Sequence, residues 1–174
     1  MNRKYPRKLS SGANNTVILL NNNEVAKLFA EDTRSDIGSE AEKMKFANAV
    51  NNLVVKFIRM EFNDELQSEM LVMERIHPID FRSHEVEIRE LWMDVFEHEL
   101  KKLHNTDFVH RDLKRPSEIQ CSAFENILLT HNGLRLIDVG ISAIKTQVGN
   151  KIFEKQLEIE QQEIKLFREF FLNR

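Results

Sequence analysis

Three short motifs lie within 31 consecutive residues of the chain: HRDLK at 110–114, ENILL at 125–129 and LIDVG at 136–140. The last two overlap a pair of expected short strands, 126–130 and 134–138, separated by a His-Asn-Gly turn. Any one of these motifs can occur by chance. Three of them in this order and this close together form a specific signal.

In this order the motifs resemble the catalytic loop, the following strand and the metal-binding motif of the protein-kinase superfamily. Upstream, VAK at 25–27 resembles the strand that carries the phosphate-binding lysine, and MERI at 73–76 resembles the hinge. The resemblance covers residues 9–142. It implies an α+β, bilobal kinase-like fold, with a small antiparallel β-sheet lobe containing one helix and a truncated, mainly helical second lobe.

Five charged residues acquire catalytic roles or candidate roles through this resemblance. Asp112 would orient the attacking hydroxyl and accept its proton, and Lys114 would meet the γ-phosphate. Lys27 would bind the α- and β-phosphates of ATP while forming an ion pair with Glu40. Glu42 is a competing candidate for that ion pair, because it lies on the same expected helix.

The resemblance also assigns the cofactor groups. Asn126 and Asp138 would bind Mg²⁺, which prefers amide and carboxylate oxygens. The backbone groups of Glu74 and Ile76 would form hydrogen bonds with adenine, and the side chain of Met73 would close the back of the pocket. The expected cofactors are therefore ATP and magnesium.

Composition agrees with one compact intracellular domain. The 174 residues are 41% hydrophobic and 30% charged, with a net charge of −3, 5 glycines and 3 prolines, which argues against disorder and against a turn-rich all-β fold. The only cysteine, Cys121, excludes an intrachain disulfide. The slightly acidic balance predicts no nucleic-acid or membrane partner, and no apolar run follows the basic residues 3–8. We expect a cytoplasmic protein, or one delivered into a host cell if it is an effector.

Hydrophobic periodicity divides the chain into a strand-rich and a helix-rich part. Strands are expected at 16–20, 25–29, 53–62 and 67–76, and helices at 35–50, 85–104 and 151–171, with a loop of about nine residues after Gly140. We interpret 1–174 as a single minimal kinase domain, with 1–76 as the first lobe and hinge and 77–174 as the second lobe. A ligand is expected in the cleft between them.

Three features depart from the kinase pattern. Thirteen residues separate Asp112 from Asn126 where four are usual, and we interpret 115–124 as an insertion whose role toward the substrate stays open. Valine 139 stands where phenylalanine is usual, and phosphate contact in the first loop rests on one glycine, Gly12. Only 34 residues follow Gly140, so the chain resembles minimal kinases such as RIO kinases and bacterial effector kinases, without control through an activation loop.

The expected terminal helix carries an apolar stripe of Phe153, Leu157, Ile164, Phe167 and Phe171, with Leu166 and Phe170 beside it. Our interpretation is that the stripe covers the second lobe. A dimer or partner surface is the alternative, so the chain is expected to be a monomer or a weak dimer.

Three functions compete at this point. Arg111 and Lys114 around Asp112 resemble kinases that act on serine or threonine, which favours ATP- and Mg²⁺-dependent transfer to a protein substrate of unknown identity. The short C-terminal part suggests a small-molecule kinase, similar to aminoglycoside or sugar phosphotransferases. The sparse glycine loop and the long catalytic loop suggest a nucleotide-binding pseudokinase.

Overall fold

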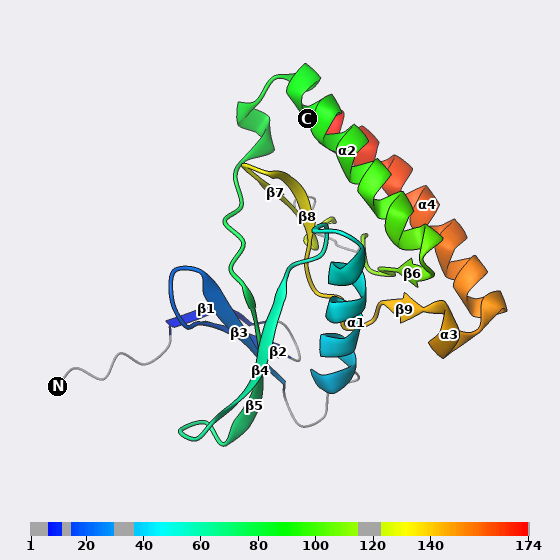
Figure 1. The fold of residues 1–174 in the computed structure, drawn as a ribbon. Coiled ribbons are helices and arrows are strands. Elements are labelled where there is room, and N and C mark those ends of the chain that lie inside the picture. Colours follow the sequence, from blue (N-terminus) through cyan, green and yellow to red (C-terminus); the bar gives the residue numbers. More distant parts are fainter. Residues whose placement is uncertain (1–6, 12–14, 30–36, 115–122, 174) are drawn as a thin grey trace.

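The structure is a computed structural model that describes residues 7–11, 15–29, 37–114 and 123–173. A sheet with one packed helix forms one end of the molecule, and two long helices with short strand pairs form the other (Figure 1). The elements are β1 (Arg7–Ser11), β2 (Asn15–Leu19), β3 (Glu24–Phe29), α1 (Ile37–Val50), β4 (Phe57–Asn63), β5 (Ser68–Glu74), the 3₁₀ turn Phe81–Ser83, α2 (Val86–Asn105), β6 (Phe108–Val109), β7 (Ile127–Thr130), β8 (Gly133–Leu136), β9 (Ala143–Ile144), α3 (Lys145–Val148) and α4 (Asn150–Leu172). This α+β architecture confirms the predicted fold class.

The five-stranded sheet is antiparallel, in the order β1-β2-β3-β5-β4. The hairpin predicted around the three asparagines is present between β2 and β3. Its turn is held by the Asn21 side chain, whose Oδ1 accepts the backbone N–H groups of Asn23 and Glu24 at 2.9 and 3.0 Å. Asparagine favours such turns because its short amide bonds to the backbone nearby.

The two faces of the sheet pack differently. Leu71 of β5 is fully buried in one core cluster with Ala41, Met44 and Ala47 of α1. The neighbouring β5 residues point the other way, since side chains alternate along a strand, and they form a smaller cluster: Ile18, Ala26, Met70 and Val72. Helix α1 therefore covers the face that carries Leu71 and, directly opposite it on β3, Lys27.

The predicted strand 53–62 is wrong at its start, because β4 begins only at Phe57. The residues before it are buried against β8 instead. Val55 donates to the carbonyl of Leu136 at 2.8 Å, and Leu136 donates to the carbonyl of Leu53 at 2.8 Å. An apolar run shows that a segment is buried but does not show which neighbour buries it.

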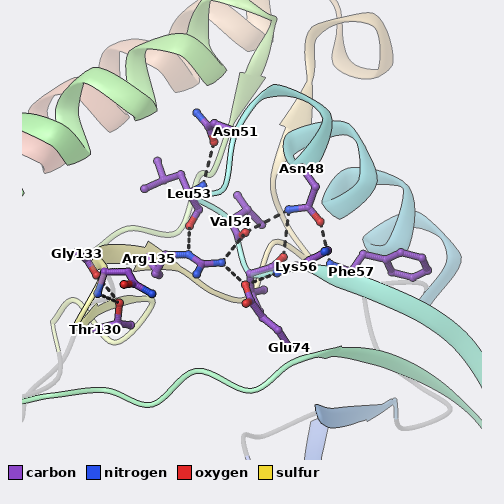
Figure 2. Close-up of polar contacts among 12 residues, drawn as sticks. Asn48, Asn51, Leu53, Val54, Lys56, Phe57, Glu74, Thr130, Gly133 and Arg135 are labelled. Atoms are coloured by element: carbon purple, nitrogen blue, oxygen red, sulfur yellow. Dashed lines mark hydrogen bonds and ion pairs between the residues drawn. The ribbon is translucent and has the colours of Figure 1, made fainter. Parts of the chain in front are cut away.

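Polar side chains join this segment to the rest of the molecule (Figure 2). The Arg135 guanidinium on β8 donates to the carbonyls of Leu53 and Val54, both at 3.4 Å, and forms an ion pair with Glu74 at the end of β5. Asn48 of α1 donates to the carbonyl of Val54 at 3.2 Å. The sheet and the helical part are thus connected behind the predicted hinge.

Helices α2 and α4 lie side by side in opposite directions (Figure 1). Arg89 near the start of α2 donates to the carbonyl of Phe171 near the end of α4 at 2.6 Å. On α4, Phe153, Phe167 and Phe171 are buried, which confirms that the apolar stripe covers the second part of the molecule. None of the described helices combines the length and the apolar content needed to cross a lipid bilayer.

The loop predicted after Gly140 is also wrong in part. It contains β9, which pairs with β6 through Phe108 opposite Ile144 and Val109 opposite Ala143, and then the short helix α3. A two-residue strand has too short a pattern to be recognised locally, and its pairing partner lies about 35 residues away in the sequence.

Candidate active site

Lys27 lies between two carboxylates. Its Nζ is 2.9 Å from both carboxylate oxygens of Glu40 on α1 and 2.8 Å from Oδ1 of Asp138. Lys27 and Glu40 are almost fully buried, whereas the Asp138 side chain is 33% exposed. The ion pair predicted for Lys27 therefore forms with Glu40, and Glu42, the competing candidate, is exposed to solvent.

Charge compensation decides the ionisation of this cluster. Burial by itself would lower the pKa of Lys27, but the carboxylates of Glu40 and Asp138 outweigh it and raise the pKa above the ordinary value. Burial raises the pKa of Glu40, and Lys27 opposes that rise. The charge of Lys43 also lowers the pKa of Glu40, so two ammonium groups act on this cluster, and the partly exposed Asp138 is the carboxylate that a cation can reach.

A second lysine, Lys43 on α1, contacts the motif that contains Asp138. The Nζ of Lys43 donates to the carbonyl of Gly140 at 2.7 Å. Val139, the residue between Asp138 and Gly140, is fully buried in the main core. Asp138 itself has φ +57°, a conformation that costs energy in a non-glycine residue and that is concentrated at functional sites.

Asn126, which follows the interpreted insertion 115–124 in the sequence, contacts the loop that carries Asp112. Asn126 donates from Nδ2 to the backbone carbonyl and to Oδ2 of Asp112, both at 2.9 Å. Its own carbonyl accepts the N–H of Ile137 at 3.0 Å, one residue before Asp138. The structure thus brings Asp112, Asn126 and Asp138 together despite the thirteen intervening residues; residues 115–122, including Cys121, lie outside the described part.

His110 connects the Asp112 loop to the residue before Asp138. Its ring is fully buried, and Nε2–H donates to the carbonyl of Ile137 at 2.9 Å. The next residue, Arg111, has φ +70°, so the chain turns sharply between His110 and Asp112. A buried histidine with a backbone partner has a structural role here, because its proton is used to fix the loop.

Helix α4 contacts the same loop through a buried carboxylate. Glu160 is 0% exposed; its Oε2 accepts the backbone N–H of Arg111 at 2.7 Å, and its Oε1 accepts from Nε2 of His104 at 2.8 Å. Arg111, the residue contacted, directly precedes Asp112 in the sequence. Glu160 therefore positions the loop from behind.

One turn further along α4, Glu163 contacts the other end of the loop. The backbone of Lys114 lowers the pKa of its carboxyl, and among the described residues no group bonds to its buried Oε2. Burial, together with the negative charges of Glu160 and Asp112, raises the pKa of Glu163. The side chain of Lys114 is exposed, so it remains accessible to a ligand.

The predicted hinge lies at the end of β5. Met73 packs against the main core, on the face that carries Leu71. The N–H of Glu74 donates to the carbonyl of Lys56 at 3.0 Å. Ile76 lies two residues after the end of β5. A cavity of about 530 Å³ lies behind this hinge, and its lining does not include Lys27, Asp112 or Asp138.

The donor set fits the magnesium ion that the resemblance implies. Both hydrogen bonds of the Asn126 side chain use Nδ2, so its amide oxygen is the atom suited to a cation, and the partly exposed Asp138 supplies a carboxylate. Within the described residues there is no separate cluster of three His, Cys, Asp or Glu side chains that would hold a metal. Gly12 lies outside the described residues.

Three functional contacts were not predicted from the sequence: those of Lys43, Glu160 and Glu163. A signal existed for one of them. Glu160 follows Phe153 by seven residues and precedes Phe167 by seven, so a glutamate interrupts the apolar stripe of α4 at a position that faces the core. For Lys43 and Glu163 the sequence contains only ordinary charges on a helix.

Comparison with solved structures identifies the architecture. The chain aligns with the Legionella pneumophila Lpg2603 kinase bound to IP6, with a TM-score of 0.65 and 17% identity over 95% of this chain. It also aligns with the Cydia pomonella granulovirus kinase PK-1, with a TM-score of 0.57 and 20% identity over 79% of this chain. The chain has a protein-kinase-like fold.

This kinase-like chain is short relative to both neighbours. It spans 58% of the Lpg2603 chain and 51% of the PK-1 chain, a little over half of each. No family model and no curated protein sequence matches it. At these identities the likeness establishes the fold, and the activity has to be argued from the residues of the site.

Proposed function

We propose that this protein transfers the γ-phosphoryl group of ATP, with magnesium, to a serine or threonine hydroxyl of a protein substrate. The main observation behind the proposal is the ion pair of Lys27 with Glu40, together with the contact of Lys27 with Asp138. Burying a lysine and a glutamate on facing elements is costly. The arrangement makes physical sense where a phosphate group binds the exposed side of the cluster together with a metal ion at Asp138.

In the proposed reaction, the hydroxyl oxygen of the substrate attacks the γ-phosphorus. A new oxygen–phosphorus bond forms, the bond from that phosphorus to the β–γ bridging oxygen breaks, and ADP leaves. Asp112 orients the hydroxyl and takes its proton. Its own orientation is fixed by Asn126, which donates to both its backbone and its side chain.

The remaining residues bind charge. Lys27 contacts the α- and β-phosphates, and the exposed Lys114 contacts the γ-phosphate. Asn126 and Asp138 hold the magnesium ion, which when bound neutralises phosphate charge. The carbonyl of Glu74 and the N–H of Ile76 hold adenine, and Gly12 is proposed for the first phosphate loop.

The test is transfer of ³²P from γ-labelled ATP to the protein itself and to generic acceptor proteins. Asp112→Asn and Asp138→Asn should each lower the rate by at least about 100-fold. Asp64→Asn, in the exposed turn between β4 and β5, is the matched control and should leave the rate unchanged. Assays are run with and without added IP6, because one structural neighbour is bound to it.

Two results would replace the proposal by its alternatives. Phosphorylation of aminoglycosides or sugars with no labelled protein would identify a small-molecule kinase. A Mg²⁺-dependent thermal shift with ATP, but no transfer to any acceptor, would identify a nucleotide-binding pseudokinase. Full transfer by Asp112→Asn would contradict the assignment of the site.

A further inference from the structure

Strand β4 forms one edge of the sheet and is unusually exposed along its length. In the described part of the chain, β5 is the only strand paired with it. Five consecutive residues, 58–62, are exposed, and three of them are large and apolar: Ile58 at 36%, Met60 at 37% and Phe62 at 53%. Edge strands usually avoid pairing through lysine or proline, and β4, with the sequence FIRMEFN, contains neither.

The side chains of β4 are sorted by face. Met60 lies opposite Leu71 and Phe62 opposite Glu69, so both point to the face that α1 covers further along the sheet. Arg59 and Glu61 point to the other face, where Arg59 reaches Glu24 of β3 at 3.0 Å. The free edge therefore presents apolar groups on one face and a +/− pair on the other.

We propose that β4 pairs antiparallel with β4 of a second copy of this chain, with Met60 opposite the partner's Met60. An isologous pair of this kind has its two-fold axis perpendicular to the sheet. Such an axis leaves each side chain on its own face, and because side chains alternate along a strand, one residue must stand opposite itself at the centre. The proposal is independent of the catalytic function.

The charges of Arg59 and Glu61 determine which residue of β4 stands opposite itself at the two-fold axis. With Arg59 at the centre, two arginines face each other, and with Glu61 at the centre, two glutamates do. With Met60 at the centre, Arg59 faces the partner's Glu61, and Glu61 faces the partner's Arg59. Opposite charges directly across a strand pair stabilise it and like charges destabilise it, so the sequence of this edge is complementary to itself in one register.

The apolar face agrees with the same register. The two Met60 side chains meet at the axis. Ile58 is the extra residue of a β-bulge, because Phe57 pairs with Met73 and Arg59 with the adjacent Val72. The bulge limits the pairing to the segment that follows it, so we expect a small interface and a weak, concentration-dependent dimer.

Crosslinking tests the register directly. Because Cys121 is the only cysteine, a Cys121→Ser background allows one cysteine to be placed at will. Met60→Cys should give a disulfide dimer under mild oxidation, since residues directly opposite in antiparallel strands have Cα atoms about 4.5–5.5 Å apart, which a disulfide spans. Leu66→Cys, in the adjacent turn where Leu66 is 46% exposed, is the control and should stay monomeric.

Charge reversal tests the partner. In sedimentation equilibrium, Arg59→Glu and Glu61→Arg should each raise the dimer dissociation constant by about tenfold or more, because each creates two like-charge contacts. An equimolar mixture of the two variants should associate again, since one edge is then acidic and the other basic. Lys101→Glu, an exposed change on α2, should have no effect, and thermal melts should show that every variant is folded.

Three results would overturn the proposal. The first is a monomer at every concentration up to about 0.5 mM, a range in which even weak dimers become populated. The second is a dimer that is insensitive to both charge reversals, which would place the contact on another surface. The third is equal crosslinking of Met60→Cys and Leu66→Cys, which would show random collision.

Discussion

The α1 side and the α4 side of the site both bury glutamates, but they compensate them differently. On the α1 side, Glu40 receives both of its short contacts from the ammonium of Lys27. On the α4 side, Glu160 receives a backbone N–H and a histidine N–H, and an oxygen of Glu163 has no partner among the described residues. The first region is held by opposite charge, and the second by hydrogen bonds to a loop.

This difference separates ligand binding from loop positioning. The Lys27 cluster includes the partly exposed Asp138, so a ligand can change its charge balance. Glu160 is fully buried and accepts a hydrogen bond from the backbone of the 110–114 loop. Changes on the α1 side should therefore affect nucleotide affinity, whereas changes on the α4 side should affect turnover without affecting affinity.

The largest effect on stability is expected from Lys27→Met. Removing the ammonium leaves the buried Glu40 carboxylate without its ion-pair partner, which should lower the free energy of unfolding by about 3 kcal/mol in urea denaturation. The double variant Lys27→Met/Glu40→Met should lose less than the single variant, because it removes both charges. Equal losses in the two variants would show that the ion pair contributes little.

Glu160→Ala should have the next largest effect. It removes the acceptor of both the Arg111 N–H and His104, which should cost about 2 kcal/mol of stability. The turnover number in the ³²P assay should fall while the ATP dissociation constant stays unchanged. Glu160→Gln, which keeps one acceptor oxygen, is the matched variant and should recover part of the turnover.

A parallel loss of ATP affinity and turnover in Glu160→Ala would contradict the separation of the two sides. It would mean that α4 acts on the nucleotide pocket as a whole, and the comparison between the two regions would then fail.

The smallest effect is expected from Glu163→Gln, and it should depend on pH. The pKa of Glu163 is raised in the folded state, so the folded protein binds a proton that the unfolded chain releases near its ordinary pKa. Stability linked to this group is therefore present at low pH and is lost as the pH rises through the folded-state pKa. Glu163→Gln should raise stability at pH 7–8, by less than about 1 kcal/mol because the group is partly exposed.

The gain from Glu163→Gln should fade as the pH is lowered toward the unfolded-state pKa, where glutamate is protonated in both states. Thermal melts between pH 4.5 and 8 measure this trend. Glu158→Gln, an exposed change on the same helix, should show no trend. A gain independent of pH would indicate a helix-propensity effect instead of a buried charge.

The sequence by itself determined the order of elements and the identity of the central polar groups. The motifs around Asp112, Asn126 and Asp138 are local, and the 3.6-residue and 2-residue periods of the long helices and strands are local as well. For this reason the hairpin between β2 and β3 and the helices α1, α2 and α4 could be predicted before the structure was known. The resemblance predicted an ion pair of Lys27 with Glu40 or Glu42, and the structure decided for Glu40.

Only the tertiary structure decided which distant groups meet. The return of Asn126 to Asp112 after thirteen residues, the burial of Leu53–Val55 on β8 and the contact of Glu160 with Arg111 depend on how the elements pack. A charge on a helix looks the same in sequence whether it faces water or a loop 49 residues away. The environment of such a charge depends on residues that come near it only when the chain folds, and these residues cannot be identified from the local sequence pattern.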